Sequence, residues 1–136
     1  MRRTFVLALA FALAAACAAG PNPALVPTLT MPADGALADN GCTTDEGEAI
    51  VWDFNWTDVP GASSYELWVK HRSSAEPEVH EMNLLTSSHR SGRIATADGE
   101  FLQGWEWKVR ATVGGVAQPW TPTARFAVEP PNTDCQ

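Results

Sequence analysis

The chain has 136 residues, nine Lys and Arg against sixteen Asp and Glu, and a formal charge of −7 at pH 7. This length fits one domain with a single hydrophobic core. The shortage of cations argues against nucleic acid as a partner, because phosphate binding needs clustered Lys and Arg. Beyond the first twenty residues, no apolar run is long enough to span a bilayer.

Residues 1–16 have the layout of a bacterial signal peptide. Two arginines follow Met1, an apolar run extends from Phe5 to Leu13, and small residues follow. The run is far shorter than the ~20 residues of a membrane-spanning helix, which favours a cleaved export signal. Removal of residues 1–16 takes away two arginines and no acid, so the charge falls by two units from −7 to −9. A surface with this negative charge repels anionic lipid headgroups. We therefore expect any membrane attachment to come from a covalently bound lipid.

The sequence fits two alternative cleavage sites at the end of the signal peptide. The segment from Leu13 to Cys17 resembles the lipobox of bacterial lipoproteins, in which the cysteine is diacylated and becomes the new N-terminus. The family prefers Leu where this chain has Ala14, and Leu13 stands one place too early. The Ala-X-Ala triplets around Ala16 fit ordinary cleavage instead. For a lipoprotein, Ala18 after the cysteine implies sorting to the outer membrane.

The cysteine count favours lipidation. Three cysteines in an exported chain leave one without a partner, and an acylated Cys17 would explain the odd thiol. Cys42 and Cys135 would then remain as one pair in an oxidising compartment. Cleavage after Cys17 would leave the same pair. No C-x-x-C spacing is present, so we prefer a structural disulfide to a redox role.

Residues 17–26 are small, Pro-rich and uncharged, and we expect a tether that leads into one domain at 27–136. After the tether the apolar residues alternate, and no helical period is visible. Gly114 and Gly115 predict a hairpin turn. About seven strands in a domain of this size are typical of an immunoglobulin-like sandwich. The expected strands are Thr28–Met31, Ala49–Trp56, Ser64–His71, Val79–Leu84, an edge strand near Ser88–Ala95, Gly104–Thr112 and Thr123–Glu129.

Four segments, in the right order, resemble a fibronectin type III-like domain of the kind common in bacterial envelope proteins. The resemblance implies an all-β fold, a seven-stranded antiparallel immunoglobulin-like sandwich. The segments are Pro27–Gly35 for the first strand and its turn, Phe54–Val69 for the second and third strands, Leu102–Ala111 for strand F, and Trp120–Val128 for the last strand.

This resemblance carries two further expectations. The family often has a tyrosine, the tyrosine corner, where this chain has Trp105, and we expect packing to replace the usual hydroxyl bond there. In such a sandwich Cys42 and Cys135 would lie at the same pole. A bridge between them would stabilise the fold by about 4–5 kcal/mol.

One aromatic side chain is expected on the outer face of the sandwich. Trp56, Trp105 and Trp107 share inward positions, but the neighbours of Trp68, Leu67 and Val69, occupy the inside. In the implied topology the outward residues beside Trp68 are Lys108 and Arg110. With Trp120 they form either a face that binds a sugar or peptide, or a ladder of cations stacked on indoles, which we favour.

No metal site and no catalytic motif is predicted. His71 and His80 flank a turn and would face each other across a hairpin. Glu81 or His89 could complete a metal site with them, but this spacing does not fix the third and fourth ligands that a metal needs. G-x-S-x-G, H-E-x-x-H and phosphate-loop motifs are missing from the sequence. Glu66 and Glu106 would neighbour each other on a wet sheet face, where burial raises no pKa.

We therefore expect a non-enzymatic envelope protein without a cofactor, acting as an interaction or adhesion module for a protein or glycan. It would be an outer-membrane-anchored lipoprotein, or otherwise periplasmic or secreted. The alternative is a carbohydrate-binding module that uses Trp68 and Trp120 as its stacking surface.

Overall fold

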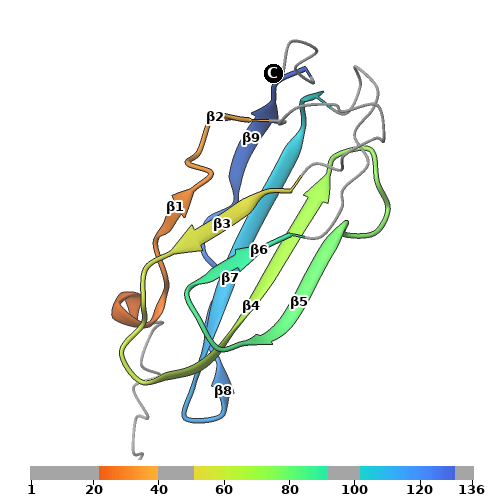
Figure 1. Cartoon of the computed structure of the whole chain (residues 1–136). Helices are drawn as coiled ribbons and strands as arrows, with labels where there is room; N and C mark the ends of the chain where they lie inside the picture. Colours follow the sequence, from red (N-terminus) through yellow and green to blue (C-terminus); the bar gives the residue numbers. More distant parts are fainter. Residues whose placement is uncertain (1–21, 40–50, 92–101, 131–136) are drawn as a thin grey trace, which may run out of the picture.

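The computed structural model describes residues 22–39, 51–91 and 102–130 (Figure 1). In these ranges the chain forms nine strands and one short 3-10 helix, η1 (Pro23–Leu25). The strands are β1 (Leu29–Met31), β2 (Ala36–Ala38), β3 (Asp53–Trp56), β4 (Ala62–His71), β5 (Val79–Leu84), β6 (Ser88–Arg90), β7 (Trp105–Val113), β8 (Val116–Ala117) and β9 (Ala124–Val128). The expected all-β fold is confirmed.

The strands lie in two sheets. Sheet A has the order β1-β3-β6, and sheet B has the order β2-β9-β7-β4-β5, with β8 paired to β7. The long strands β4 and β7 form the centre of sheet B, paired antiparallel from Ala62 opposite Val113 to His71 opposite Trp105. Among the described strands, β1 and β6 are the edges of sheet A, and β2 and β5 are the edges of sheet B.

The alternation of apolar and polar residues builds the two faces of sheet B. Along β4, Tyr65, Leu67 and Val69 are buried, and the residues between them are half-buried. The same alternation runs along β7. Because successive side chains of a strand point to opposite faces, one face of sheet B is dry and the other carries Glu, Lys, Arg and Trp.

The core is a cluster of aromatic rings from both sheets. Trp52 and Phe54 come from the segment of β3, and Trp105, Trp107 and Phe126 come from sheet B. The ring centroids of Trp52 and Trp105 lie 4.7 Å apart, and those of Phe54 and Trp107 lie 5.1 Å apart. Such edge-to-face and tilted pairs stabilise by about 0.5–1.5 kcal/mol beyond the apolar area that they bury. The rings therefore hold the two sheets together.

Trp105 occupies the position that the resemblance assigned to the tyrosine corner. Its side chain is buried, and its ring stacks on Phe126 and meets the rings of Trp52 and His71 edge to face. Packing against three rings from three different segments thus fills this corner.

The predicted hairpin turn joins β7 to β8. Gly114 and Gly115 have φ of 59° and 77°. Positive φ at both central positions is what a tight hairpin turn requires, and glycine adopts it without a steric penalty.

The expectation of seven antiparallel strands is wrong in its count and in one pairing. β2 and β8 were not expected, and β2 runs parallel to β9, with Ala36 opposite Phe126. β2 could not be predicted from the sequence, because its three residues, Ala-Leu-Ala, show no alternation of apolar and polar side chains. The chain leaves β1 in sheet A, turns at Gly35 and joins the other sheet, where Gly35 N–H donates to the Arg125 carbonyl at 2.7 Å.

The remaining bounds differ slightly from the predictions. β5 has the predicted bounds, and β4 begins at Ala62, two residues early. Of the edge strand expected near Ser88–Ala95, the structure describes Ser88–Arg90 as β6. Of the longer strand expected over Ala49–Trp56, β3 covers Asp53–Trp56, and Val51 and Trp52 are described outside it.

Several predictions lie outside the described residues. These are the signal peptide, the lipidation of Cys17 and the Cys42–Cys135 pair. Within the ranges that the structure describes, no helix has the length and hydropathy needed to cross a membrane.

Candidate functional site

The outer face of sheet B brings together all four residues that the sequence placed there. Trp68 lies opposite Lys108 in the β4–β7 register. The Lys108 ammonium lies 4.6 Å from the ring centroid of Trp68 and 4.9 Å from that of Trp120. The Arg110 guanidinium carbon lies 4.6 Å from the ring centroid of Trp120. We call these four side chains the cation–aromatic ladder.

Trp120 reaches the ladder because its neighbour ties the chain to β7. Thr121 N–H donates to the Val109 carbonyl at 2.9 Å, and Val109 N–H donates to the Thr121 hydroxyl at 3.1 Å. Thr121 is buried, so this pair of hydrogen bonds holds the segment after β8 against the sheet. The indole at position 120 is thereby held over the outer face.

Glu66 extends the ladder towards β5. It accepts hydrogen bonds at 2.6 Å from Arg110 Nε and at 2.8 Å from His80 Nε2, and its side chain is 13% exposed. Partial burial alone would raise the pKa of Glu66, but the hydrogen bonds and charges of His80 and Arg110 outweigh it and lower that pKa below its ordinary value of 4.5. Glu66 is therefore ionised at neutral pH.

The ladder stabilises the sheet face by its own contacts. Each exposed cation–π contact contributes about 0.5–1 kcal/mol. The Glu66 ion pair keeps Arg110 in place over Trp120, while Lys108 lies within reach of two rings. Every one of these side chains therefore has a partner within the protein.

We expect Glu66→Gln to lower the free energy of unfolding by about 1 kcal/mol at pH 7. Because the folded-state pKa of Glu66 lies below its ordinary value, its contribution is present above pH 4.5 and is lost as the pH falls through the folded-state value. Urea unfolding of both proteins between pH 3 and pH 7 measures this difference. The control is Glu106→Gln, for which we expect a smaller loss, since among the described glutamates only Glu66 accepts two such hydrogen bonds from basic side chains. A difference that stays constant to pH 3 would contradict the assignment.

The expected histidine pair across the β4–β5 hairpin is wrong. His80 is opposite Trp68, three positions before His71, and lies on the outer face, because the hairpin is centred nearer to Ser74 than the expected pairing required. His71 is buried, and its Nε2 lies 2.6 Å from the Gln103 carbonyl. The two imidazoles are thus on opposite faces of the sheet. Among the described residues, no three His, Cys, Asp or Glu side chains are grouped to hold a metal.

The expected neighbourhood of Glu66 and Glu106 is also wrong. The register places Glu66 opposite Arg110 and Glu106 opposite Lys70. Each glutamate therefore faces a cation across the β4–β7 pair, and the two carboxylates do not lie together for acid–base chemistry.

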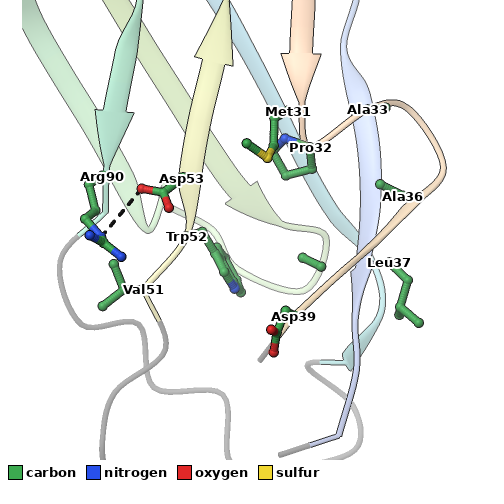
Figure 2. A pocket seen from close by; sticks show the side chains of 11 residues that line it. Met31, Pro32, Ala33, Ala36, Leu37, Asp39, Val51, Trp52, Asp53 and Arg90 are labelled. Carbon is green, nitrogen blue, oxygen red and sulfur yellow. Dashed lines mark ion pairs between the residues drawn. The ribbon is translucent and has the colours of Figure 1, made fainter. Parts of the chain in front are cut away.

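A cavity of about 460 Å³ opens at the edge of the sandwich between the two sheets. Figure 2 shows Val51 and Arg90 on one side, Leu37 on the other, Met31 above and Trp52 between them. We call it the edge cavity. Its volume lies in the range of small-ligand sites, about 300–1,000 Å³.

The edge cavity gathers exposed apolar side chains. Leu37 is 65% exposed, Met31 is 50% exposed and Val51 is 41% exposed, and all three line it. Scattered single apolar residues on a surface need no explanation, but a contiguous group around a concavity is typical of a binding site.

Trp52 also lines the edge cavity, although its indole nitrogen is buried. Its side chain is 2% exposed, and its indole nitrogen Nε1 has no hydrogen-bond partner. In Figure 2 the nitrogen end of the ring points towards the side of the edge cavity where Asp39 lies. A buried donor without an acceptor costs about 1–3 kcal/mol. Most buried polar atoms are paired, and Trp56 Nε1, which does not line the edge cavity, is a second exception.

Sequence reasoning missed the edge cavity. Its two walls belong to β2, which was not expected, and to the start of β3 with the end of β6. One feature of the sequence could have indicated it. Leu37 is a large apolar residue between two small alanines and just before Asp39, outside any strand that the alternation predicts.

No family model and no curated protein sequence matches the chain. Among solved structures, it is similar to an Fn3-like protein from Clostridium thermocellum at 17% sequence identity. That match covers 74% of this chain and 96% of the other chain, with a TM-score of 0.46.

Proposed function

We propose that this protein is a non-enzymatic interaction module, exported to a bacterial envelope and anchored there by a lipid on Cys17. It binds a partner protein through the edge cavity. The observation that carries this proposal is the place of the edge cavity relative to the N-terminal end of the domain.

The N-terminal end and the edge cavity lie at opposite ends of the sandwich. η1, which lies within the range expected for the tether, is at the lower end in Figure 1, while β2 lies at the upper end. Thr57 N–H, just after β3, donates to the Thr28 carbonyl, whereas the edge cavity borders Asp53 at the start of β3. A domain anchored through its N-terminus would therefore present the edge cavity away from the membrane.

The chemistry of the described carboxylates supports a non-enzymatic role. Glu66 is the described acid with a lowered pKa, and both of its oxygens are held by basic side chains. A general acid at neutral pH needs a raised pKa, and a general base needs a carboxylate free to receive a proton. Glu66 fits neither role, because its pKa is lowered and because Arg110 and His80 donate hydrogen bonds to its two carboxylate oxygens.

The experiment places a photoreactive side chain at each end of the domain in living cells. The variants are Leu37→benzoylphenylalanine at the edge cavity and, as the matched control, Val116→benzoylphenylalanine on β8 at the other end. The two positions are 65% and 63% exposed. We expect a cross-linked partner protein from position 37 and none from position 116. The same cells with Cys17→Ser test the anchor, because the protein should then leave the membrane fraction.

Equal cross-linking from both positions, or none from position 37, would refute the binding role. Retention of the Cys17→Ser variant in the membrane fraction would refute the lipid anchor but not the binding role.

A carbohydrate-binding role remains the second candidate, because Trp68 and Trp120 lie together on the outer face and are half-buried. We favour the first, because Lys108 lies over both rings and competes with a sugar for their faces. Quenching of tryptophan fluorescence by a glycan, abolished by Trp68→Ala, would favour the second candidate instead.

A further inference from the structure

We propose that Asn55 is modified with an N-linked oligosaccharide while the chain is exported. This inference rests on one part of the proposed function, the export, and is independent of binding at the edge cavity. Three observations carry it: the sequence around Asn55, the place of its side chain in sheet A, and the absence of a hydrogen bond that the modification would break.

Asn55, Trp56 and Thr57 form an acceptor sequence for N-glycosylation, which is Asn, any residue except proline, and then Ser or Thr. None of the other asparagines of the chain has Ser or Thr two places later, so the acceptor sequence occurs once. Asp53 stands two places before Asn55. A carboxylate there can pair with a cationic side chain of the transferase, and some bacterial oligosaccharyltransferases require one.

β3 places Asn55 on the outer face of sheet A. Phe54 and Trp56 are buried in the core, whereas Asp53 is exposed and Asn55 is half-buried. Because successive side chains of a strand point to opposite faces, the side chain of Asn55 points away from the core. An oligosaccharide attached to it would extend outward and leave the aromatic rings between the sheets undisturbed.

The side-chain amide of Asn55 has no structural task that the modification would disturb. In the described part of the chain it makes no hydrogen bond. Asn55 is also not among the residues that line the edge cavity. The folded domain can therefore carry a sugar on this nitrogen without losing a contact of its own.

Folding takes up the rest of the acceptor sequence. The Thr57 hydroxyl accepts a hydrogen bond from Thr28 N–H at 2.9 Å. Asn55 lies opposite Met31 on β1 and Ser88 on β6, so its strand is paired on both sides. A transferase has to bind this stretch unpaired and to reach the Thr57 hydroxyl. The transfer therefore precedes folding, while the chain emerges from the export machinery.

The transfer replaces one bond at the sugar by another. Asn55 Nδ2 attacks the anomeric carbon of a lipid-pyrophosphate-linked oligosaccharide. The carbon–nitrogen bond forms as the bond from that carbon to the pyrophosphate oxygen breaks, and lipid pyrophosphate leaves with the electron pair. The amide nitrogen gives one proton to a base of the transferase. Nothing is oxidised or reduced.

The test follows the mass of the full chain expressed with its export signal in bacteria. One strain carries an oligosaccharyltransferase and its lipid-linked oligosaccharide, and a second strain lacks only the transferase. We expect the protein from the envelope fraction of the first strain to be heavier by one oligosaccharide. Fragmentation should place the added mass on the peptide that contains Asn55. The second strain should yield the unmodified chain.

Matched variants assign the acceptor. Asn55→Gln keeps a side-chain amide and should abolish the modification, while Asn83→Gln, at an exposed asparagine without the acceptor sequence, should leave it unchanged. Thr57→Val should also abolish it, whereas Thr57→Ser keeps a hydroxyl and should retain it. Asp53→Asn should lower the modified fraction by about tenfold or more. Because the transfer precedes folding, these results do not depend on how well each variant folds.

The modified protein should unfold at the same urea concentration as the Asn55→Gln variant, since the sugar lies on the outer face. A modified protein that fails to fold would overturn the inference, because the structure could not then carry the sugar.

The outcomes separate this inference from the proposed function. An exported chain without added mass, or added mass that survives Asn55→Gln, would overturn the inference and leave the interaction role standing. Fractionation of the same cells measures the export. A chain that stays in the cytoplasm would refute the export, and with it both proposals.

Discussion

Trp107→Ala is expected to lower the free energy of unfolding by about 3–5 kcal/mol, the range measured for removing a large aromatic side chain from a packed core. Trp107 has no exposed surface, and its ring packs on Phe54 of the opposite sheet. Its indole nitrogen donates to the Pro32 carbonyl at 3.1 Å, which fixes the chain between β1 and β2. Since domains of this size are stable by about 5–15 kcal/mol, this loss would shift unfolding to much lower urea.

Urea unfolding followed by far-UV circular dichroism measures this loss without relying on tryptophan fluorescence. Trp107→Phe keeps an aromatic ring and removes the hydrogen bond to Pro32, so we expect a smaller loss of about 1–2 kcal/mol. The control is Trp68→Ala on the outer face, which gives up mainly its contact with Lys108 and should cost about 1 kcal/mol. Equal effects of Trp107→Ala and Trp68→Ala would contradict the division into an inner and an outer face.

His71→Phe is expected to lower the free energy of unfolding by about 2–4 kcal/mol, although it preserves an aromatic ring beside Trp105. Ser73 N–H donates to Nδ1 of His71 at 3.2 Å, so this nitrogen is assigned as the acceptor. Nε2–H then donates to the Gln103 carbonyl at 2.6 Å. Phenylalanine would leave the Ser73 amide and the Gln103 carbonyl without these bonds in a part-buried place, where each costs about 1–3 kcal/mol.

The same substitution on the outer face is the control for His71→Phe. His80 is exposed and bonds to Glu66, so His80→Phe should cost less than about 1 kcal/mol. Thermal unfolding at pH 7 measures both variants. If His71→Phe proves as stable as the native protein, the buried imidazole does not hold the end of β4 to the segment before β7.

The structure separates what stabilises this domain from what is left for binding. The aromatic rings between the sheets pack on one another, and the cations and indoles of the cation–aromatic ladder pair with each other. The edge cavity is different, because the exposed side chains of Met31, Leu37 and Val51 line it. Exposed apolar side chains gathered around a concavity are better explained by a binding partner than by folding.

The cation–aromatic ladder was accessible to sequence reasoning because it depends on parity along two neighbouring strands. Leu67 and Val69 forced Trp68 outward, and the same alternation placed Lys108 and Arg110 outward on β7. The histidine pair failed for the opposite reason. Its geometry depended on the register across the β4–β5 turn, and the observed register places Trp68 and not His71 opposite His80.

The sequence by itself determined the all-β fold, the inward aromatic residues and the outward ladder. Each of these depends only on the alternation of apolar and polar residues within one strand. Only the tertiary structure decided that β2 joins β9 in parallel and that the edge cavity exists. Both depend on contacts between distant segments, such as the hydrogen bond from Arg125 N–H to the Asp34 carboxylate, which spans 91 positions. A local pattern cannot specify which distant edge a three-residue strand will join, because that choice is made by the packing of the whole sandwich.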